Sequence, residues 1–280
     1  MQGESNFTVE GSDGPISGWR LGSGEPVVLL HGGPGLSEYL GSLAEELADG
    51  YSTIRYQQRG LAPSNASGPF TVERHSLDAI EVIDHLGLDR VLLVGHSWGG
   101  HLAMHLAFSN PNRLKAVVVV DPLGAVGDGG EADMTQNMTA RIPPANMARA
   151  QELDEAAMRG EGTPDDAVEG LRLVWPAYFA DPGTAPPMPP MQISLPCYSE
   201  TWDSIHGHFG SRTLEAALPS VHVPMLFLLG SGSPIPLSHG QASAALIPGA
   251  SVRIVEGAGH FPWMEQPGVV RAALDSLIAV

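Results

Sequence analysis

Hydrophobic residues in the first 121 positions fall into short runs separated by longer stretches of helical periodicity. Runs such as 27–30 and 91–94 have the length and β-branched content of buried strands. The stretches between them repeat apolar residues every three or four positions, as amphipathic helices do. This alternation predicts a largely parallel sheet covered on both faces, with an antiparallel edge formed by the first strands. Predicted strands cover 7–10, 16–21, 27–30, 52–56, 91–94 and 117–120, and predicted helices cover 37–48, 72–86 and 99–109.

The pattern changes after Asp121-Pro122, because residues 124–218 contain no strong strand signal. One helix is predicted at 147–159, and Thr163-Pro164 opens a second with acidic residues in its first turn. We expect Pro176 to bend or end that helix and the proline-rich segment 181–191 to be extended. The alternation then resumes with strands at 224–229 and 252–255 and helices at 238–247 and 267–278. The sequence therefore predicts an α/β core of residues 1–123 and 219–280 with an inserted helical cap at 124–218.

The composition is that of a compact globular protein. The chain has 280 residues, of which 43% are hydrophobic and 16% charged, and its net charge is −17. Lys115 is the only lysine. A chain so acidic, without a basic cluster, is a poor partner for nucleic acid or an anionic membrane. We attribute the charge to solubility, although it is also compatible with cationic substrates.

Cysteine usage and the chain's N-terminal residues bear on redox chemistry and location. Cys197 is the only cysteine, so no internal disulfide forms, and no Cys/His cluster has zinc spacing. We expect a structural thiol, and no metal or cofactor. The first residues lack a basic start and an apolar run, and no stretch is long enough to span a membrane. These features predict a cytoplasmic protein, and they say nothing about its oligomeric state.

The strongest chemical signal is Gly95-His96-Ser97-Trp98-Gly99, which directly follows the predicted strand 91–94. A G-x-S-x-G motif between a strand and a helix is typical of a nucleophile elbow, which exposes the serine hydroxyl at a sheet edge. The spacing alone also occurs in ordinary glycine-bounded turns. The strand before the motif and the helix after it favour Ser97 as a nucleophile.

Two further segments fit this interpretation. His260 follows the last predicted strand within Gly257-Ala258-Gly259-His260, where it can accept the serine proton as a general base. The turn His31-Gly32-Gly33-Pro34-Gly35 follows strand 27–30, and the Gly33 and Trp98 N–H groups are suited to hold a developing oxyanion. We expect His31 to order this loop rather than to perform chemistry.

In this order, the motifs resemble the α/β-hydrolase superfamily over nearly the whole chain. The forms H-G-G-P-G and G-H-S-W-G-G are most similar to the cap-bearing branch that contains the proline iminopeptidases. The resemblance implies an α/β-hydrolase fold and a Ser-His-acid triad. In that family the acid usually follows the strand after the cap, in a G-x-x-D-P pattern. This chain has Gly230-Ser231-Gly232-Ser233-Pro234 there, and it contains no Asp or Glu between Ala216 and Val255.

We predict that Asp121, at the end of strand 117–120, takes the role of the triad acid that is missing after the cap. Some members of the superfamily, including a subgroup of haloalkane dehalogenases and the zearalenone lactonase type, have their acid after this strand. Asp121-Pro122 is also compatible with a simple turn into the cap. Asp128 is the fallback, and Glu256 is too close to His260 in sequence for an easy fit.

The sequence thus predicts a cofactor-independent serine hydrolase of the esterase kind that cleaves a small-molecule ester, lactone or amide. Ser97 is the expected nucleophile, His260 the base and Asp121 the orienting acid. Two alternatives stay open: a proline iminopeptidase-type aminopeptidase, and a vestigial ligand-binding member with little turnover. The substrate itself is not predicted. Aromatic residues of the cap that are suited either to a substrate pocket or to simple packing are Trp175, Tyr178, Phe179, Trp202 and Phe209.

Overall fold

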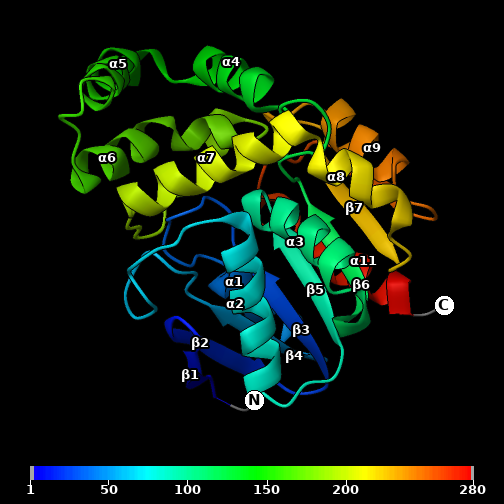
Figure 1. Cartoon of the computed structure of the whole chain (residues 1–280). Coiled ribbons are helices and arrows are strands. Elements are labelled where there is room, and N and C mark those ends of the chain that lie inside the picture. The colour runs from blue at the N-terminus through cyan, green and yellow to red at the C-terminus, as the bar shows by residue number, and fades with distance from the viewer. Residues whose placement is uncertain (1–2, 279–280) are drawn as a thin grey trace.

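The computed structural model describes residues 3–278, and its centre is one eight-stranded sheet (Figure 1). The strand order is β1-β2-β4-β3-β5-β6-β7-β8. β2 pairs antiparallel with both β1 and β4, and all the other pairs, from β4–β3 to β7–β8, are parallel. The predicted sheet and its antiparallel edge are confirmed. The strands are β1 Ser5–Gly11, β2 Gly14–Gly22, β3 Glu25–Leu30, β4 Tyr51–Tyr56, β5 Val91–His96, β6 Leu114–Val120, β7 Met225–Gly230 and β8 Ser251–Val255.

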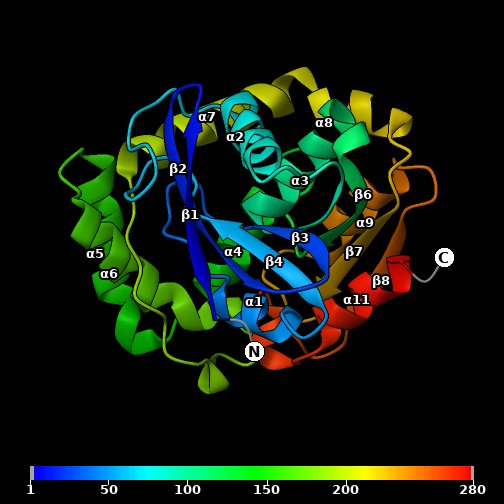
Figure 2. The same ribbon diagram turned by 90° about the horizontal axis from the view of Figure 1, so that it is seen from below.

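Helices cover both faces of the sheet, as the nearly continuous apolar strands require (Figure 2). On one face the core includes residues of α2 Val72–His85, α3 Trp98–Ser109, α8 Thr213–Ala217 and α9 Leu237–Ala245. On the other it includes residues of α1 Gly41–Leu47, α10 Pro262–Glu265 and α11 Val269–Ile278. The sheet is therefore rigidly packed, and the loops at the carboxyl ends of its strands are held in place.

The helix predicted at 37–48 is too long at its start, since α1 begins only at Gly41. The Ser37 N–H donates to the Gln192 carbonyl, 3.0 Å away, and Leu36 forms an antiparallel bridge with Ile193. This pairing with a distant segment holds residues 36–37 in a loop. Local periodicity carries no information about that contact.

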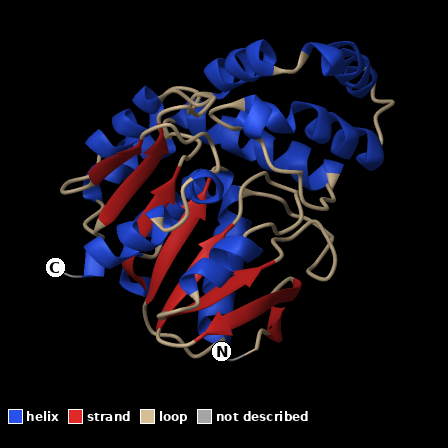
Figure 3. Ribbon diagram, turned by 180° about the vertical axis from the view of Figure 1, so that it is seen from behind, coloured by secondary structure: helices blue, strands red, loops and turns tan. Residues whose placement is uncertain are grey.

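Four helices lie across the carboxyl edge of the sheet, between β6 and β7 in sequence (Figure 3). The predicted Thr163 start is confirmed, because Thr163 and Asp166 form a reciprocal capping box, and the helix ends just before Pro176. The prediction at 147–159 finds most of one helix, but it misses α4 and α7 entirely. The four helices are α4 Glu131–Arg141, α5 Pro144–Met158, α6 Pro164–Val174 and α7 Leu195–Ser211.

The use of 123/124 and 218/219 as domain limits stays a prediction. The expectation drawn from the first residues falls partly on Met1 and Gln2, which lie outside the described range. Within residues 3–278, every helix is too short or too polar to cross a membrane.

Candidate active site

Ser97 lies at the tight turn between β5 and α3, with φ 57° and ψ −120°. A Cβ on Gly95 would come within 2.2 Å of the Gly99 oxygen, and one on Gly99 within 2.1 Å of the Leu30 oxygen. The motif therefore needs glycine at both places for steric reasons. The Ser97 N–H donates to the Val120 carbonyl at 3.0 Å, which ties the turn to the end of β6. Ser97 is half-buried, whereas its two neighbours in sequence are buried.

Asp121 follows β6 and His260 lies in the loop after β8, and their side chains are in contact at the carboxyl edge of the sheet. The His260 Nδ1 is 2.6 Å from the Asp121 Oδ2, and both side chains are only 3% exposed. Asp121 has a φ of 41°, a backbone conformation that L-residues rarely adopt and that costs of order 1–3 kcal/mol. Among residues 3–278, only Ser97, Asp121 and Arg212 combine a positive φ with a side chain larger than glycine. Strain is therefore concentrated where the nucleophile candidate and its acid candidate lie.

The Asp121 carboxylate has two further donors. The Gly230 N–H donates to Oδ1 at 3.2 Å, and the Ser233 hydroxyl donates to Oδ2 at 2.5 Å. Gly230 is the last residue of β7 and Ser233 lies in the loop that follows it, and β7 pairs in parallel with β6. The carboxylate is thus fully engaged although it is buried, as a stable buried charge requires.

The oxyanion candidates lie beside Ser97. The Trp98 N–H is in the first turn of α3, where a backbone N–H has no acceptor within its own helix. Gly33 lies in the loop after β3 with a φ of 60°, and both residues line one cavity together with Ser97 and His260. His31 orders this loop as expected, because its Nε2 accepts the Gln58 N–H at 3.3 Å. Burial lowers the pKa of His31 to about 4, so its ring is neutral.

A buried chain of hydrogen bonds, which the sequence analysis did not find, links three loops of the site. The Gly32 N–H donates to the Tyr39 hydroxyl at 2.7 Å, and that hydroxyl lies 2.6 Å from His96 Nδ1. The His96 Nε2 is 2.7 Å from the His260 carbonyl. Burial lowers the pKa of His96 well below its usual value, so the ring is neutral, with Nε2–H donating to the carbonyl and Nδ1 accepting from Tyr39. The only feature of the sequence that could have pointed to this hydrogen-bond chain is the position of His96 inside the G-x-S-x-G motif.

The helical segment above the sheet also holds the His260 loop. The His260 N–H donates to the Tyr178 carbonyl at 2.8 Å, and the two rings stack with centroids 5.3 Å apart. The Glu265 carboxylate accepts the Gly259 N–H at 2.6 Å and the Ala180 N–H at 3.0 Å. A Cβ on Gly259 would lie 2.4 Å from the Tyr178 oxygen. Glu265 thus links the segment around Tyr178 and Ala180 to the His260 loop, and the missing side chain of Gly259 allows these two segments to lie close together.

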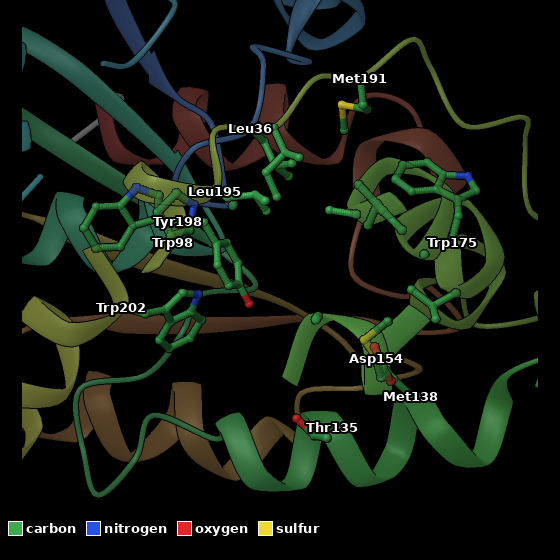
Figure 4. Close-up of a pocket in the computed structure, with 18 of the residues that line it drawn as sticks. Leu36, Trp98, Thr135, Met138, Asp154, Trp175, Met191, Leu195, Tyr198 and Trp202 are labelled. Atoms are coloured by element: carbon green, nitrogen blue, oxygen red, sulfur yellow. The ribbon is translucent and has the colours of Figure 1, made fainter. Parts of the chain in front are cut away.

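A cavity of about 790 Å³ is lined by Ser97 and by residues of all four helices α4 to α7, and Figure 4 shows part of its wall. Its walls are mainly apolar, and within the described range neither Lys nor Arg lines it. Glu131, Asp154 and Asp166 are its acidic residues. Figure 4 shows Tyr198 and Trp202, one helical turn apart on α7, on one side of the cavity and Trp175 on another. The apolar wall residues labelled there include Leu36, Met138, Trp175, Met191, Leu195 and Trp202.

Not all the cap aromatics named from the sequence reach this cavity. Trp175, Tyr178 and Trp202 line it, whereas Phe179 is buried in the core against Phe261. Phe209 packs against His101. The periodicity of the cap sequence does not distinguish wall residues from packing residues.

Two other sequence candidates lie in different surroundings. Asp128 accepts the backbone N–H groups of Gly130 and Ala132 at the start of α4, so it acts as a local cap. Cys197 is buried, its thiol donates to the Arg59 carbonyl, and burial raises its pKa to about 12. Among residues 3–278, no three His, Cys, Asp or Glu side chains gather closely enough to hold a metal ion.

Comparison with known proteins identifies the class that this fold and site define. Residues 27–273 match the model of the Alpha/beta hydrolase family, so the chain belongs to that family and is a hydrolase. The fold is the α/β-hydrolase fold, and the superfamily predicted from the motifs is confirmed.

Individual relatives are distant. A putative esterase/lipase of Haemophilus influenzae is 24% identical over 90% of this chain and 82% of its own length. The proline iminopeptidase of Heyndrickxia coagulans is 24% identical over 92% of this chain and 91% of its own. The crystal structure of VinJ superposes with a TM-score of 0.74 at 21% identity, covering 98% of both chains. These similarities support the fold, and they do not assign the chain to one branch.

Proposed function

We propose that this protein is a serine hydrolase that cleaves a small-molecule ester, lactone or amide through an acyl-enzyme on Ser97. Ser97 Oγ attacks the carbonyl carbon while His260 takes its proton and later returns it to the leaving group. Asp121 holds His260 Nδ1–H and stabilises the imidazolium. The N–H groups of Gly33 and Trp98 donate hydrogen bonds to the negatively charged oxygen that develops. Water then attacks the acyl-enzyme, with His260 as the base, and releases the acid.

The observation that carries this proposal is the 2.6 Å contact between Asp121 and His260 at the wall of the cavity that Ser97 lines. A carboxylate in this place sets the tautomer that leaves Nε2 free to accept a proton. Strained backbone at both Ser97 and Asp121 is a further sign of a functional site.

The cavity favours substrates with a bulky, uncharged apolar part. Its volume is in the range of sites that enclose drug-sized molecules, and its walls are largely aliphatic and aromatic. A substrate carboxylate would lose its hydration there and face acidic residues instead of a cation. We therefore expect neutral esters or lactones with sizeable acyl groups.

A proline iminopeptidase-type aminopeptidase is the second candidate, and the acidic cavity residues favour it. Such an enzyme binds a free amino terminus through carboxylates. Glu131 pairs with His206 and Asp166 caps α6, which leaves Asp154 as the carboxylate suited to this task. A panel of proline arylamides against aryl esters separates the two activities, and the Asp154→Asn variant lowers only the arylamide rate if this candidate is right.

Fluorophosphonate labelling followed by steady-state kinetics tests the main proposal. The wild type and Asp121→Asn are compared with Ser97→Ala and with Asp128→Asn as a matched control. We expect labelling of the wild type but not of Ser97→Ala, a fall in kcat of up to about 10⁴ for Asp121→Asn, and no change for Asp128→Asn. An unlabelled wild type without turnover would instead support the vestigial binding protein.

A further inference from the structure

We propose that Ser233 is a positioning residue for the catalytic acid: its hydroxyl orients the Asp121 carboxylate and shares the charge that faces His260. This inference rests on the proposed function. Ser233 lies in the loop after β7, whereas Asp121 ends β6, and the two side chains meet because the strands are neighbours.

The first support is the arrangement of donors around one oxygen. Asp121 Oδ2 lies 2.5 Å from Ser233 Oγ and 2.6 Å from His260 Nδ1. An ionised carboxylate only accepts, so the hydroxyl proton of Ser233 must point to it. Hydrogen bonds to a charged oxygen are about twice as strong as neutral ones. The serine therefore competes with His260 for the same charge and limits rotation of the carboxylate.

The second support is that the Ser233 hydroxyl is itself held in place. The Ile235 N–H donates to Ser233 Oγ at 3.0 Å, which leaves the hydroxyl proton free for Asp121. Ser233 is 7% exposed, so water competes little for these bonds.

The third support is a clamp from α4 on the loop that carries Ser233. Arg141 donates to the Gly232 carbonyl at 2.7 Å, and Asn137 donates to the Pro234 carbonyl at 2.9 Å. Both side chains come from the helical layer that also forms the cavity roof. The position of the Ser233 hydroxyl, and with it that of the Asp121 carboxylate, is thus coupled to the placement of this layer.

Removing the hydroxyl has two distinct consequences. The carboxylate loses one orienting donor, and we expect kcat/KM to fall by roughly 10- to 100-fold, the factor that corresponds to one hydrogen bond to a charged group. The remaining charge then acts more strongly on the imidazolium form of His260. The acidic limb of the pH–rate profile should therefore move to higher pH.

The test compares Ser233→Ala and Ser233→Thr with Ser231→Ala. Ser231 is a matched control because it lies on the same loop, is exposed, and accepts the Gly257 N–H at 2.8 Å. We expect Ser233→Ala to lose rate and shift the acidic limb, Ser233→Thr to recover most of both, and Ser231→Ala to behave as the wild type. Because acid also lowers the folded fraction of a destabilised variant, the rate at each pH is divided by the folded fraction that circular dichroism measures at that pH, so that partial unfolding cannot imitate the shift.

An unmoved limb in Ser233→Ala, or a Ser233→Thr variant as slow as Ser233→Ala, would overturn the inference. The proposed function has its own controls in the same series. If Ser97→Ala or Asp121→Asn keeps wild-type turnover, the function fails. If both are inactive while Ser233→Ala matches Ser231→Ala, only the role of Ser233 fails.

Discussion

Replacing Tyr39 with phenylalanine removes one hydroxyl that serves two buried partners. That hydroxyl accepts the Gly32 N–H at 2.7 Å and lies 2.6 Å from His96 Nδ1. The variant keeps the ring and its edge contacts with His96 and Phe261. The change therefore isolates the two hydrogen bonds.

The expected size follows from those two bonds. A neutral hydrogen bond contributes about 0.5–1.5 kcal/mol net, so the free energy of unfolding should fall by about 1–3 kcal/mol. For a protein of this length, that lowers Tm by about 2–4 °C per kcal/mol. Loss of a whole oxyanion donor costs about 10²–10³ in kcat. Because the Gly33 N–H is displaced rather than removed, we expect a decrease of about tenfold.

Differential scanning calorimetry measures the first effect and steady-state ester hydrolysis the second. Tyr51→Phe is the control, since its hydroxyl pairs with Asp275 at the amino end of β4, at the edge opposite the site. It should leave kcat unchanged. A Tyr39→Phe variant with the Tm and kcat of the wild type would refute the view that this hydroxyl ties the Gly33 loop to the elbow.

Three further predictions concern stability and selectivity. The Asp78 side chain is 2% exposed, and its carboxylate accepts two hydrogen bonds from the Arg59 guanidinium and further ones from Arg74. The Asp78→Ala variant should therefore lower the free energy of unfolding, measured by denaturant titration, by about 3–5 kcal/mol. A loss under about 1 kcal/mol would contradict this. Burial lowers the pKa of His75 to about 3 and that of His101 to about 4, so below pH 6.5 the unfolded chain binds more protons than the folded one. Stability should then fall by about 1.4 kcal/mol per pH unit for each such histidine between pH 6.5 and 4, and a flat Tm over that range would be evidence against neutral buried rings. Finally, we compare an aryl ester whose acyl chain ends in a free carboxylate with the same aryl ester in which that carboxylate is a methyl ester. The charged substrate should react about tenfold more slowly, because the cavity is lined by carboxylates and by no described Lys or Arg. Equal kcat/KM values for the two substrates would argue against this.

Much of the sheet was predictable from the sequence, because each core strand is a short continuous run of apolar residues. The runs 91–94 and 117–120 are continuous and apolar, and they became β5 and β6 with small changes at their ends. The helices α4 to α7 were harder to predict from the sequence. The helix α4 has no buried residue and α7 contains glycine, two histidines and a free cysteine, so neither shows the clean apolar stripe that marks a core helix.

By itself, the sequence determined the order of strands and loops, the tight turn that carries Ser97, and the presence of His260 and the Gly33 loop at one edge. These features follow from local sterics and hydrophobic periodicity. Only the tertiary structure decided which carboxylate contacts His260, since Asp121 and Ser233 meet through the pairing of β6 with β7. It also decided the Tyr39–His96 chain and the Glu265 bridge. Such contacts join residues far apart in the chain, and no local pattern encodes a distance between them.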